Sequence, residues 1–175
     1  ADIPIIVIAP SKKAQSVSTV GTSVTVLDET FFKNSNELFL GDALSTNSTS
    51  INFFQTGGHG QTSAIQLRGM PKRYSTVYID GVKMSDPASP SNDFNFNHIL
   101  TKNIARVEIL KGNQSSVYGS GAIGGTINIT TKKGEPGFHK NIQYNNASHG
   151  THNLSLSLSG ADKNDNFYVG LERFH

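Results

Sequence analysis

Short runs of alternating apolar and polar residues recur through the middle of the chain and predict a small β-rich domain. In each run the apolar residues share one face, as Val107 and Ile109 do. The predicted strands are residues 51–54, 64–68, 76–80, 105–110 and 126–131. The opposite faces carry polar residues, namely Gln66, Arg68, Arg106, Glu108 and Asn128. Glycine-rich and proline-containing loops separate the strands, so no single strand is long.

Two short helices and one more strand are predicted ahead of this region. A strand SVTVL begins at Ser23 and is followed by Asp28, whose side chain is suited to cap a helical turn DETFFKN. Ser35 is expected to cap a second helix, NELFLGDAL, with Glu37 near its start. The pattern therefore predicts an α+β (mixed α/β) domain with short helices and a small central mixed sheet, ending near Gly134.

The alternation changes character after Pro136. Leu154, Leu156 and Leu158 share one face and serines occupy the other, and NFYVGLERF partly repeats this pattern. Either a soluble sandwich or a transmembrane barrel fits, because barrel strands alternate apolar-out and small-polar-in. The stretch after Gly134 suffices for roughly three spanning strands of ~10 residues. Because the smallest barrels have about eight strands, a barrel interpretation makes the chain a fragment.

Composition removes several classes of function. Cysteine is absent, so no disulfide or thiolate metal site can form. The net charge is only +2 and no Lys/Arg cluster occurs, so the sequence predicts no basic surface for binding nucleic acid. The longest apolar run, residues 3–9, is about a third of the ~20 residues that a spanning helix needs. The histidines are scattered and no catalytic motif occurs, so we expect no enzyme, no catalytic residue, no metal and no cofactor.

The segment RVEILKGNQSSVYGSGAIGGTINITT, residues 106–131, contains a glycine motif with two interpretations. Residues 119–125 satisfy G-x-G-x-x-G, which in dinucleotide-binding domains opens a helix that faces the pyrophosphate. Here the β-branched string TINITT follows, which favours a tight glycine turn between strands. A soluble mixed α/β binding domain with a nucleotide-type loop stays as the alternative hypothesis.

Several strings in this chain are characteristic when taken together. They are SVTVLDE, GGHGQTSAIQLRG, VYIDGVKMSDP, IARVEILKG and SSVYGSGAIGGTINITTKKG. In this order and spacing, residues 22–134 resemble the plug domain of TonB-dependent outer-membrane transporters. The GxGQ loop and the IDGV…DP spacing are most similar to the cobalamin (vitamin B12) branch, although siderophore receptors share much of this.

The resemblance implies an organisation and a location. Residues 1–21 would be a coupling segment and linker, 22–134 the plug, and 135–175 the first strands of an incomplete barrel that has ~22 strands in this family. The protein would lie in the outer membrane of a Gram-negative bacterium, in contact with lipid. It would take up a large nutrient, cobalamin or a ferric siderophore, with energy from the periplasmic TonB protein.

The resemblance also gives the apolar N-terminus a role. The expected TonB box comprises Ile3, Pro4, Ile5, Ile6, Val7, Ile8 and Ala9. An extended β-branched segment can be captured by strand addition to another sheet. An ordinary first strand of the plug is the alternative, and the family's usual Thr-Ala ending is replaced by Ile8-Ala9.

Two further groups of residues follow from the same resemblance. Arg68 and Lys111 match positions that pair with carboxylates of the barrel wall, although Lys lacks the bidentate fork of Arg and strand-end surface charge is the alternative. The apical loops are expected to contact substrate or, alternatively, to be loop residues without a contact. Their candidate residues are Gln55, Gly57, Gly58, His59, Gln61, Asp86, Ser89 and Asn92.

Overall fold

The computed structural model describes most of the chain in two compact units, residues 1–131 and residues 132–175. The described residues are 6–7, 15–16, 23–35, 37–47, 51–55, 57, 63–67, 69–85, 94–113, 115–146 and 152–174. No helix within these ranges is long and apolar enough to cross a membrane.

A five-stranded mixed sheet is the centre of the first unit. In order across the sheet, its strands are β3 (Ser23–Leu27), β8 (Ile104–Lys111), β9 (Gly125–Thr131), β6 (Ser75–Ile79) and β7 (Val82–Met84). β6 and β9 pair in parallel, and the other neighbours are antiparallel. This confirms the predicted mixed α/β domain with a small mixed central sheet.

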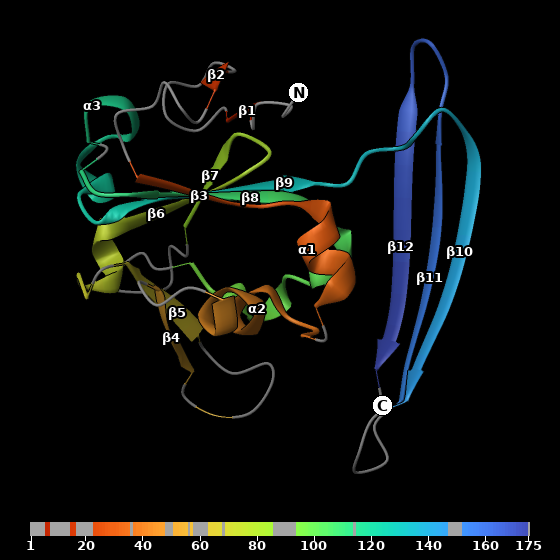
Figure 1. Ribbon diagram of the computed structural model, residues 1–175, viewed down its shortest axis with the longest axis horizontal. Coiled ribbons are helices and arrows are strands. Elements are labelled where there is room, and N and C mark those ends of the chain that lie inside the picture. The colour runs from red at the N-terminus through yellow and green to blue at the C-terminus, as the bar shows by residue number, and fades with distance from the viewer. Residues whose placement is uncertain are drawn as a thin grey trace. The chain divides into compact units, whose positions relative to one another are not determined.

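The apolar face of the sheet is covered by two helices and a hairpin. Figure 1 shows α1 (Glu29–Asn34), α2 (Leu40–Asn47) and the hairpin of β4 (Ile51–Gln55) and β5 (Ser63–Leu67) on one side of the sheet. Short 3₁₀ turns complete the unit: η2 (Lys72–Tyr74), η3 (Phe96–His98), η4 (Thr101–Asn103) and η5 (Ser120–Ala122). The buried core comprises Phe32, Leu40, Leu44, Ile51, Ile65, Leu67, Val77, Phe96, Ile104, Val107, Ile109, Ile127 and Ile129.

The first helix begins as the sequence predicts. Asp28 is its N-cap, and the carboxylate oxygen Oδ1 accepts a hydrogen bond from the backbone N–H of Phe31 at 3.0 Å. This bond satisfies one of the amide groups that have no partner inside the first helical turn. The helix then directs Phe32, which is 4% exposed, into the core.

The second helix begins later than predicted, at Leu40, and residues 37–39 lie outside it. The prediction that Ser35 caps it is wrong, because Ser35 is the C-cap of α1. The late start of this helix is caused by hydrogen bonds from a residue far along the chain. Thr101 donates its backbone N–H to the carbonyl of Leu38 at 3.0 Å and its hydroxyl to the carbonyl of Glu37 at 2.7 Å. These bonds occupy carbonyls that an earlier helix start would have used.

A tight turn joins β6 to β7 and is tied to the end of β9. Asp80 and Gly81 have φ values of 48° and 83°, as a two-residue type I′ hairpin requires. The Asp80 carboxylate accepts hydrogen bonds from the Thr131 N–H at 2.9 Å and the Thr131 hydroxyl at 2.6 Å. The strand predicted over residues 76–80 ends at Asp80, but β7 was not predicted.

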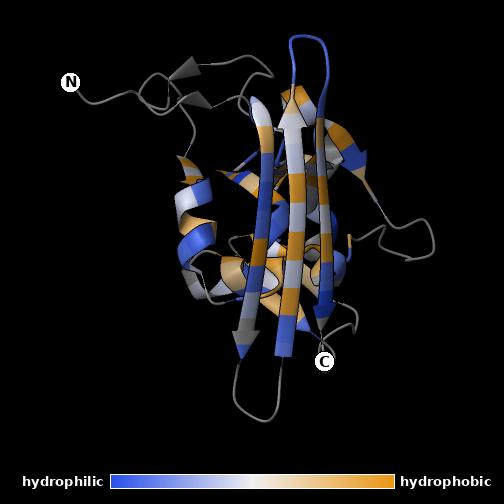
Figure 2. Cartoon of the chain, turned by 90° about the vertical axis from the view of Figure 1, so that its right-hand side faces the viewer, coloured by the Kyte–Doolittle hydropathy of each residue, from blue (hydrophilic) through white to orange (hydrophobic). Residues whose placement is uncertain are grey.

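The second unit is a three-stranded antiparallel sheet of β10 (Gly137–Asn146), β11 (His152–Ala161) and β12 (Asn166–Phe174). Apolar residues recur at alternate positions along these strands (Figure 2). The apolar set is exposed, as Leu158 at 44% and Leu171 at 66% illustrate, while Ser155 and Ser157 on the other face are half-buried. The predicted alternation is therefore present as a sheet with one apolar and one polar face.

The segment that leads into β10 lies directly against the second sheet. A Cβ on Gly134 would collide with the backbone carbonyl oxygens of Gly160 and Phe167. Pro136 forms a bridge with Ala161 two residues further along. Only glycine fits at position 134, because the colliding atoms are backbone and cannot rotate away.

We predict that the tie between Asp80 and Thr131 stabilises the first unit. Asp80→Ala should lower the free energy of unfolding by about 2 kcal/mol, since it removes two hydrogen bonds to a charged group at a left-handed backbone position. Asp80→Asn should cost roughly half as much, because Asn tolerates positive φ and keeps one acceptor. Urea unfolding measures both, with Asp162→Ala in the turn of the second unit as the control. Equal stability of Asp80→Ala and the parent chain would contradict the prediction.

Candidate functional site

The predicted partner-binding segment contains a short strand, β1 (Ile6–Val7), which pairs antiparallel with β2 (Gln15–Ser16). The structure thus places the backbone of Ile6 and Val7 in an extended conformation that strand addition requires. The other members, Ile3, Pro4, Ile5, Ile8 and Ala9, lie outside the described residues. A ladder of two residue pairs is marginal, so it opposes release of the segment only weakly.

The bases of the two predicted apical loops meet at one point of the first unit. Gln55 ends β4 directly opposite Ser63, which starts β5. The Ser63 hydroxyl donates to Asn95 Oδ1 at 2.9 Å and accepts from the Phe96 N–H at 3.1 Å. Ser63 is 2% exposed and Asn95 is half-buried, and their hydrogen bond fixes the residue after the second loop against the residue that starts β5.

Only part of the candidate apical set falls within the described residues. Gln55 is half-buried and Gly57 is exposed. Gly58, His59, Gln61, Asp86, Ser89 and Asn92 lie outside the described ranges. The contact between Ser63 and Asn95 was not predicted, because the two residues are far apart in the chain and no local pattern links them.

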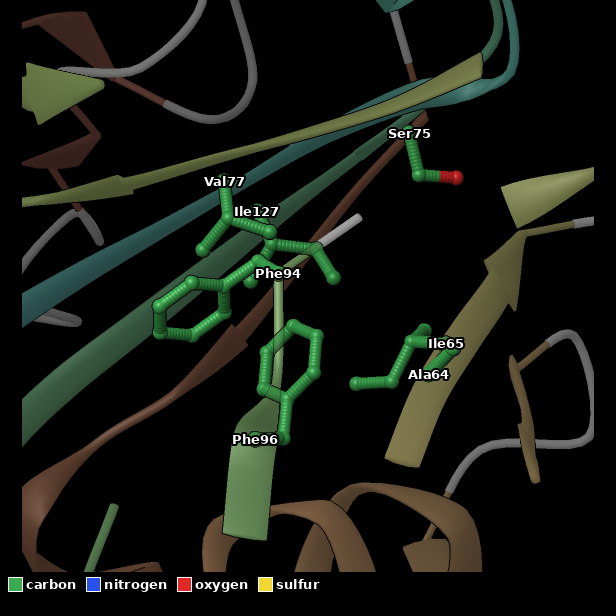
Figure 3. A pocket seen from close by; sticks show the side chains of 7 residues that line it. All are labelled: Ala64, Ile65, Ser75, Val77, Phe94, Phe96 and Ile127. Carbon is green, nitrogen blue, oxygen red and sulfur yellow. The ribbon is translucent and has the colours of Figure 1, made fainter. Parts of the chain in front are cut away.

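A small cavity lies beneath these loop bases and is too small for a nutrient. Its volume of about 10 Å³ is at the lower limit for one water molecule. Phe94 and Phe96 meet edge to face with ring centroids 5.0 Å apart, and they close it from one side (Figure 3). The lining residues are Ala64, Ile65, Ser75, Val77, Phe94, Phe96 and Ile127. A large ligand therefore has no room at this cavity.

The ends of strands β5 and β8, at Leu67 and Lys111, lie at the same glycine. Lys111, half-buried at the end of β8, pairs with Gly125 in β9. Leu67, which immediately precedes Arg68, also lies against Gly125. If Gly125 carried a Cβ, that atom would be only 2.7 Å from Leu67 Cδ1. Arg68 itself lies outside the described residues. The strand ends at 67 and 111 are thus neighbours, although they are far apart in sequence.

The glycine motif at residues 119–125 leads into a strand. β9 begins at Gly125, so the loop presents no helix N-terminus to a pyrophosphate. Gly125 has a φ of 144°, and a Cβ there would collide with the backbone carbonyl oxygen of Leu110. The glycine is required by close approach of two strands, which is the turn interpretation of the motif.

The second face of the central sheet, opposite the core, holds a partly buried ion pair that was not predicted from the sequence. Glu108 was assigned to an outward polar face, but it is 1% exposed. Arg106 lies beside it on β8, with Nε 3.0 Å from Glu108 Oε1. The prediction failed because helix α3 (Ser115–Tyr118) covers this face, and SSVY carries no helical periodicity in the sequence.

Two tyrosines complete this buried polar region. The rings of Tyr78 and Tyr118 are 4.9 Å apart, and both side chains are less than a tenth exposed. Burial, with smaller contributions from Tyr78 and the Glu108 carboxylate, raises the pKa of Tyr118 to about 12. Burial also raises the pKa of Tyr78. Both phenols therefore stay protonated and neutral at physiological pH.

Nothing in the described part of the chain resembles a catalytic or metal centre. No group of three or more His, Cys, Asp or Glu residues is placed to hold a metal ion there. His139, for example, has its Nε2 2.9 Å from the carbonyl oxygen of Pro136, which is a local turn contact. The features described at or near the predicted site residues are the loop bases and the strand ends at 67 and 111, and the partly buried polar face is a further feature that was not predicted.

Comparison with known proteins gives this arrangement a family. The model of the TonB-dependent Receptor Plug Domain matches residues 16–126. The structure is similar to the ferric yersiniabactin uptake receptor FyuA from Yersinia pestis, with a TM-score of 0.70 and 25% identity over 91% of this chain and 25% of that chain.

Two further solved structures share the fold. BauA, the ferric preacinetobactin receptor from Acinetobacter baumannii, has a TM-score of 0.72 and 14% identity over 92% of this chain and 24% of that chain. A chain of the FpvAI–pyocin S2 complex has a TM-score of 0.76 and 17% identity over 97% of this chain and 22% of that chain. The chain spans about a quarter of the length of these structures.

We predict that Tyr118 makes the first unit sensitive to alkaline pH. The folded state keeps the phenolic proton up to about pH 12, whereas an unfolded tyrosine loses it near pH 10. The stabilisation is therefore complete below pH 10 and is lost as the pH rises towards 12. Chemical unfolding across this range should show a smaller loss for Tyr118→Phe than for the parent, while Tyr144→Phe, at an exposed tyrosine, should follow the parent. Parallel curves for all three chains would refute the assignment.

Proposed function

The chain belongs to the family of TonB-dependent receptor plug domains, and from this premise we propose that it gates nutrient uptake through a Gram-negative outer-membrane receptor. The family match over residues 16–126 carries the proposal, with the shared fold as support. The proposed role is energised transport and not catalysis. Substrate binds at the plug apices, and a periplasmic partner then remodels the plug so that the substrate passes.

We propose three parts for the chain: coupling segment and linker at 1–21, plug at 22–134, and opening barrel strands at 135–175. The last part is supported by strand lengths of 10, 10 and 9 residues, which suit a bilayer crossing. Its exposed leucines would face lipid and its serines the lumen. The aromatic rings of Phe138 and Phe167, 6.4 Å apart, would lie on the lipid face near one interface.

The proposed energy-coupling site is the segment Ile3–Ala9, recognised by TonB. Strand addition supplies main-chain hydrogen bonds that resist pulling, so affinity does not depend on a preformed pocket. The extended backbone of Ile6 and Val7 supports this role. Its two-residue ladder with β2 is short enough for the partner to compete with it.

The proposed cargo is a ferric siderophore, with cobalamin as the alternative. FyuA and BauA, two of the similar structures, are described as receptors for ferric yersiniabactin and ferric preacinetobactin. The alternative rests on the GxGQ and IDGV…DP strings in this sequence. In both cases the apical residues, with Gln55 at the fixed loop base, would hydrogen-bond a large polar ligand.

The proposed latch consists of Arg68 and Lys111, each paired with a carboxylate of the barrel wall. The adjacency of strand ends 67 and 111 at Gly125 supports a shared location. A single ammonium group at position 111 forms a less directional pair than a guanidinium would.

We predict that loss of the coupling segment separates binding from uptake. Deleting residues 3–9 from the full-length receptor should leave the Kd for cargo unchanged and abolish uptake by cells. Ile6→Pro should act in the same way, because it removes the β1 amide donor, whereas the matched variant Ile6→Val should transport normally. Unimpaired uptake by the deletion variant would refute the coupling proposal.

We predict that the intact receptor discriminates between the two cargo classes. Titration with a radioiron-loaded siderophore and, in parallel, with radiolabelled cyanocobalamin should show saturable binding of the ferric chelate alone. Gln55→Ala should weaken that binding by about tenfold, as expected for one lost hydrogen bond to cargo. Asn52→Ala, at an exposed position on the same strand, is the control. Saturable binding of cyanocobalamin alone would overturn the siderophore assignment.

A further inference from the structure

The two faces of the central sheet are lined by different chemistry. One face carries the apolar core. On the other face a polar strip, defined as Arg106, Glu108, Asn128, Thr126 and Tyr78, crosses three strands. Asn128 pairs with Glu108 on one side and with Tyr78 on the other, so these side chains form a continuous row.

Three members of the polar strip are buried, whereas Arg106 and Asn128 are half-buried. Glu108 is 1% exposed, Thr126 is 0% exposed and Tyr78 is 9% exposed. Within the described part of the chain, the buried Thr126 hydroxyl has no hydrogen-bond partner. Burying a carboxylate and an unsatisfied hydroxyl is unfavourable compared with apolar side chains of the same size. If Glu108 and Thr126 stayed buried permanently, apolar side chains at these two positions would make the fold more stable.

The segment that covers this strip is small. The cover, defined as residues 115–124, consists of α3, Gly119, η5 and the two residues before β9. Its apolar contact is a cluster of Val117, Tyr118 and Ala122 with Tyr78. Figure 1 shows α3 on the side of the sheet opposite α1 and α2. The other face, by contrast, is sealed by the whole core, so the cover is the less firmly held layer.

Glycines bound the cover where the backbone must turn. Gly112 before it, Gly119 within it and Gly125 after it have φ values of 111°, 86° and 144°. At its C-terminal end, the Gly124 N–H donates to the carbonyl of Tyr74 at 2.9 Å. The Gly124 carbonyl also accepts a hydrogen bond from the Gly112 N–H at 3.3 Å, so the cover can swing away only if both of these backbone bonds break, while β8 and β9 remain paired.

We propose that residues 115–124 are a hinged cover and that the polar strip beneath is a transient contact surface for cargo crossing the plug. This inference rests on the proposed function and names the layer of the plug that opens. The strip carries one guanidinium and one carboxylate together with amide, phenol and hydroxyl groups. It therefore suits a cargo that presents many hydrogen-bonding groups, and it is not selective for net charge.

Cysteine accessibility in the full-length receptor tests the cover. The chain has no native cysteine, so Ala122→Cys introduces one thiol at a site that is 0% exposed. A membrane-impermeant maleimide should label it about tenfold faster in energised cells supplied with cargo than after collapse of the proton gradient. Val82→Cys, at a residue outside the cover that is 64% exposed, should react equally in both states. Labelling of Ala122→Cys that is absent during uptake, or equal without energy, would overturn the proposal.

A disulfide lock provides a second test that does not depend on labelling. A Cβ on Gly121 lies 3.3 Å from the Thr76 hydroxyl, a spacing that a disulfide can bridge with a small adjustment. The double variant Gly121→Cys, Thr76→Cys should take up the radioiron-loaded siderophore or cyanocobalamin normally when reduced. Oxidation should abolish uptake, and reductant should restore it.

The two proposals fail in different ways. Full uptake by the oxidised double variant would overturn the cover while leaving energised uptake intact. Full uptake by the receptor that lacks residues 3–9 would overturn the coupling proposal itself, whatever the lock does.

Discussion

The pairing of β8 with β9 is the constraint on which the rest of the first unit depends. The ladder from Ile104 and Thr131 to Lys111 and Gly125 places the core residues on one face and the polar residues, together with Leu110, on the other. The same ladder brings the end of β8 to the glycine that Leu67 also contacts. Both the core and the strand ends proposed as the latch are therefore set by one antiparallel register, and a slip of one residue would exchange the two faces.

The regular parts of the fold followed from the sequence because their cause is local. The strands β6, β8 and β9 alternate β-branched and polar residues, and the Asp28 cap lies next to the helix that it starts. The later start of α2 did not follow, because its cause is Thr101, far along the chain. Local pattern describes an element well when the partner that fixes it is also local.

In the candidate site, too, the features with a local cause were predicted and those with a distant cause were not. The glycine turn at 119–125 was foreseen, since the β-branched string after it excludes a helix. The burial of Glu108 was not foreseen, because alternation shows only that its face differs from the core face. Whether that second face is wet depends on a covering segment that carries no periodic signal. The tie between Ser63 and Asn95 is likewise a product of tertiary contact.

The segment that connects the two units is short, because contacts fix the chain at Thr131 and again at Gly134. Asp80 holds Thr131 at the end of the first unit, and Gly134 is fitted against Gly160 and Phe167 in the second. Only Lys132 and Lys133 lie between these fixed points, and extended residues reach ~3.6 Å each at most. The link is therefore short, so it cannot lengthen much to absorb the pulling on the N-terminus that is proposed above. While both anchorages hold, the proposed passage of cargo would need a rearrangement inside the first unit itself.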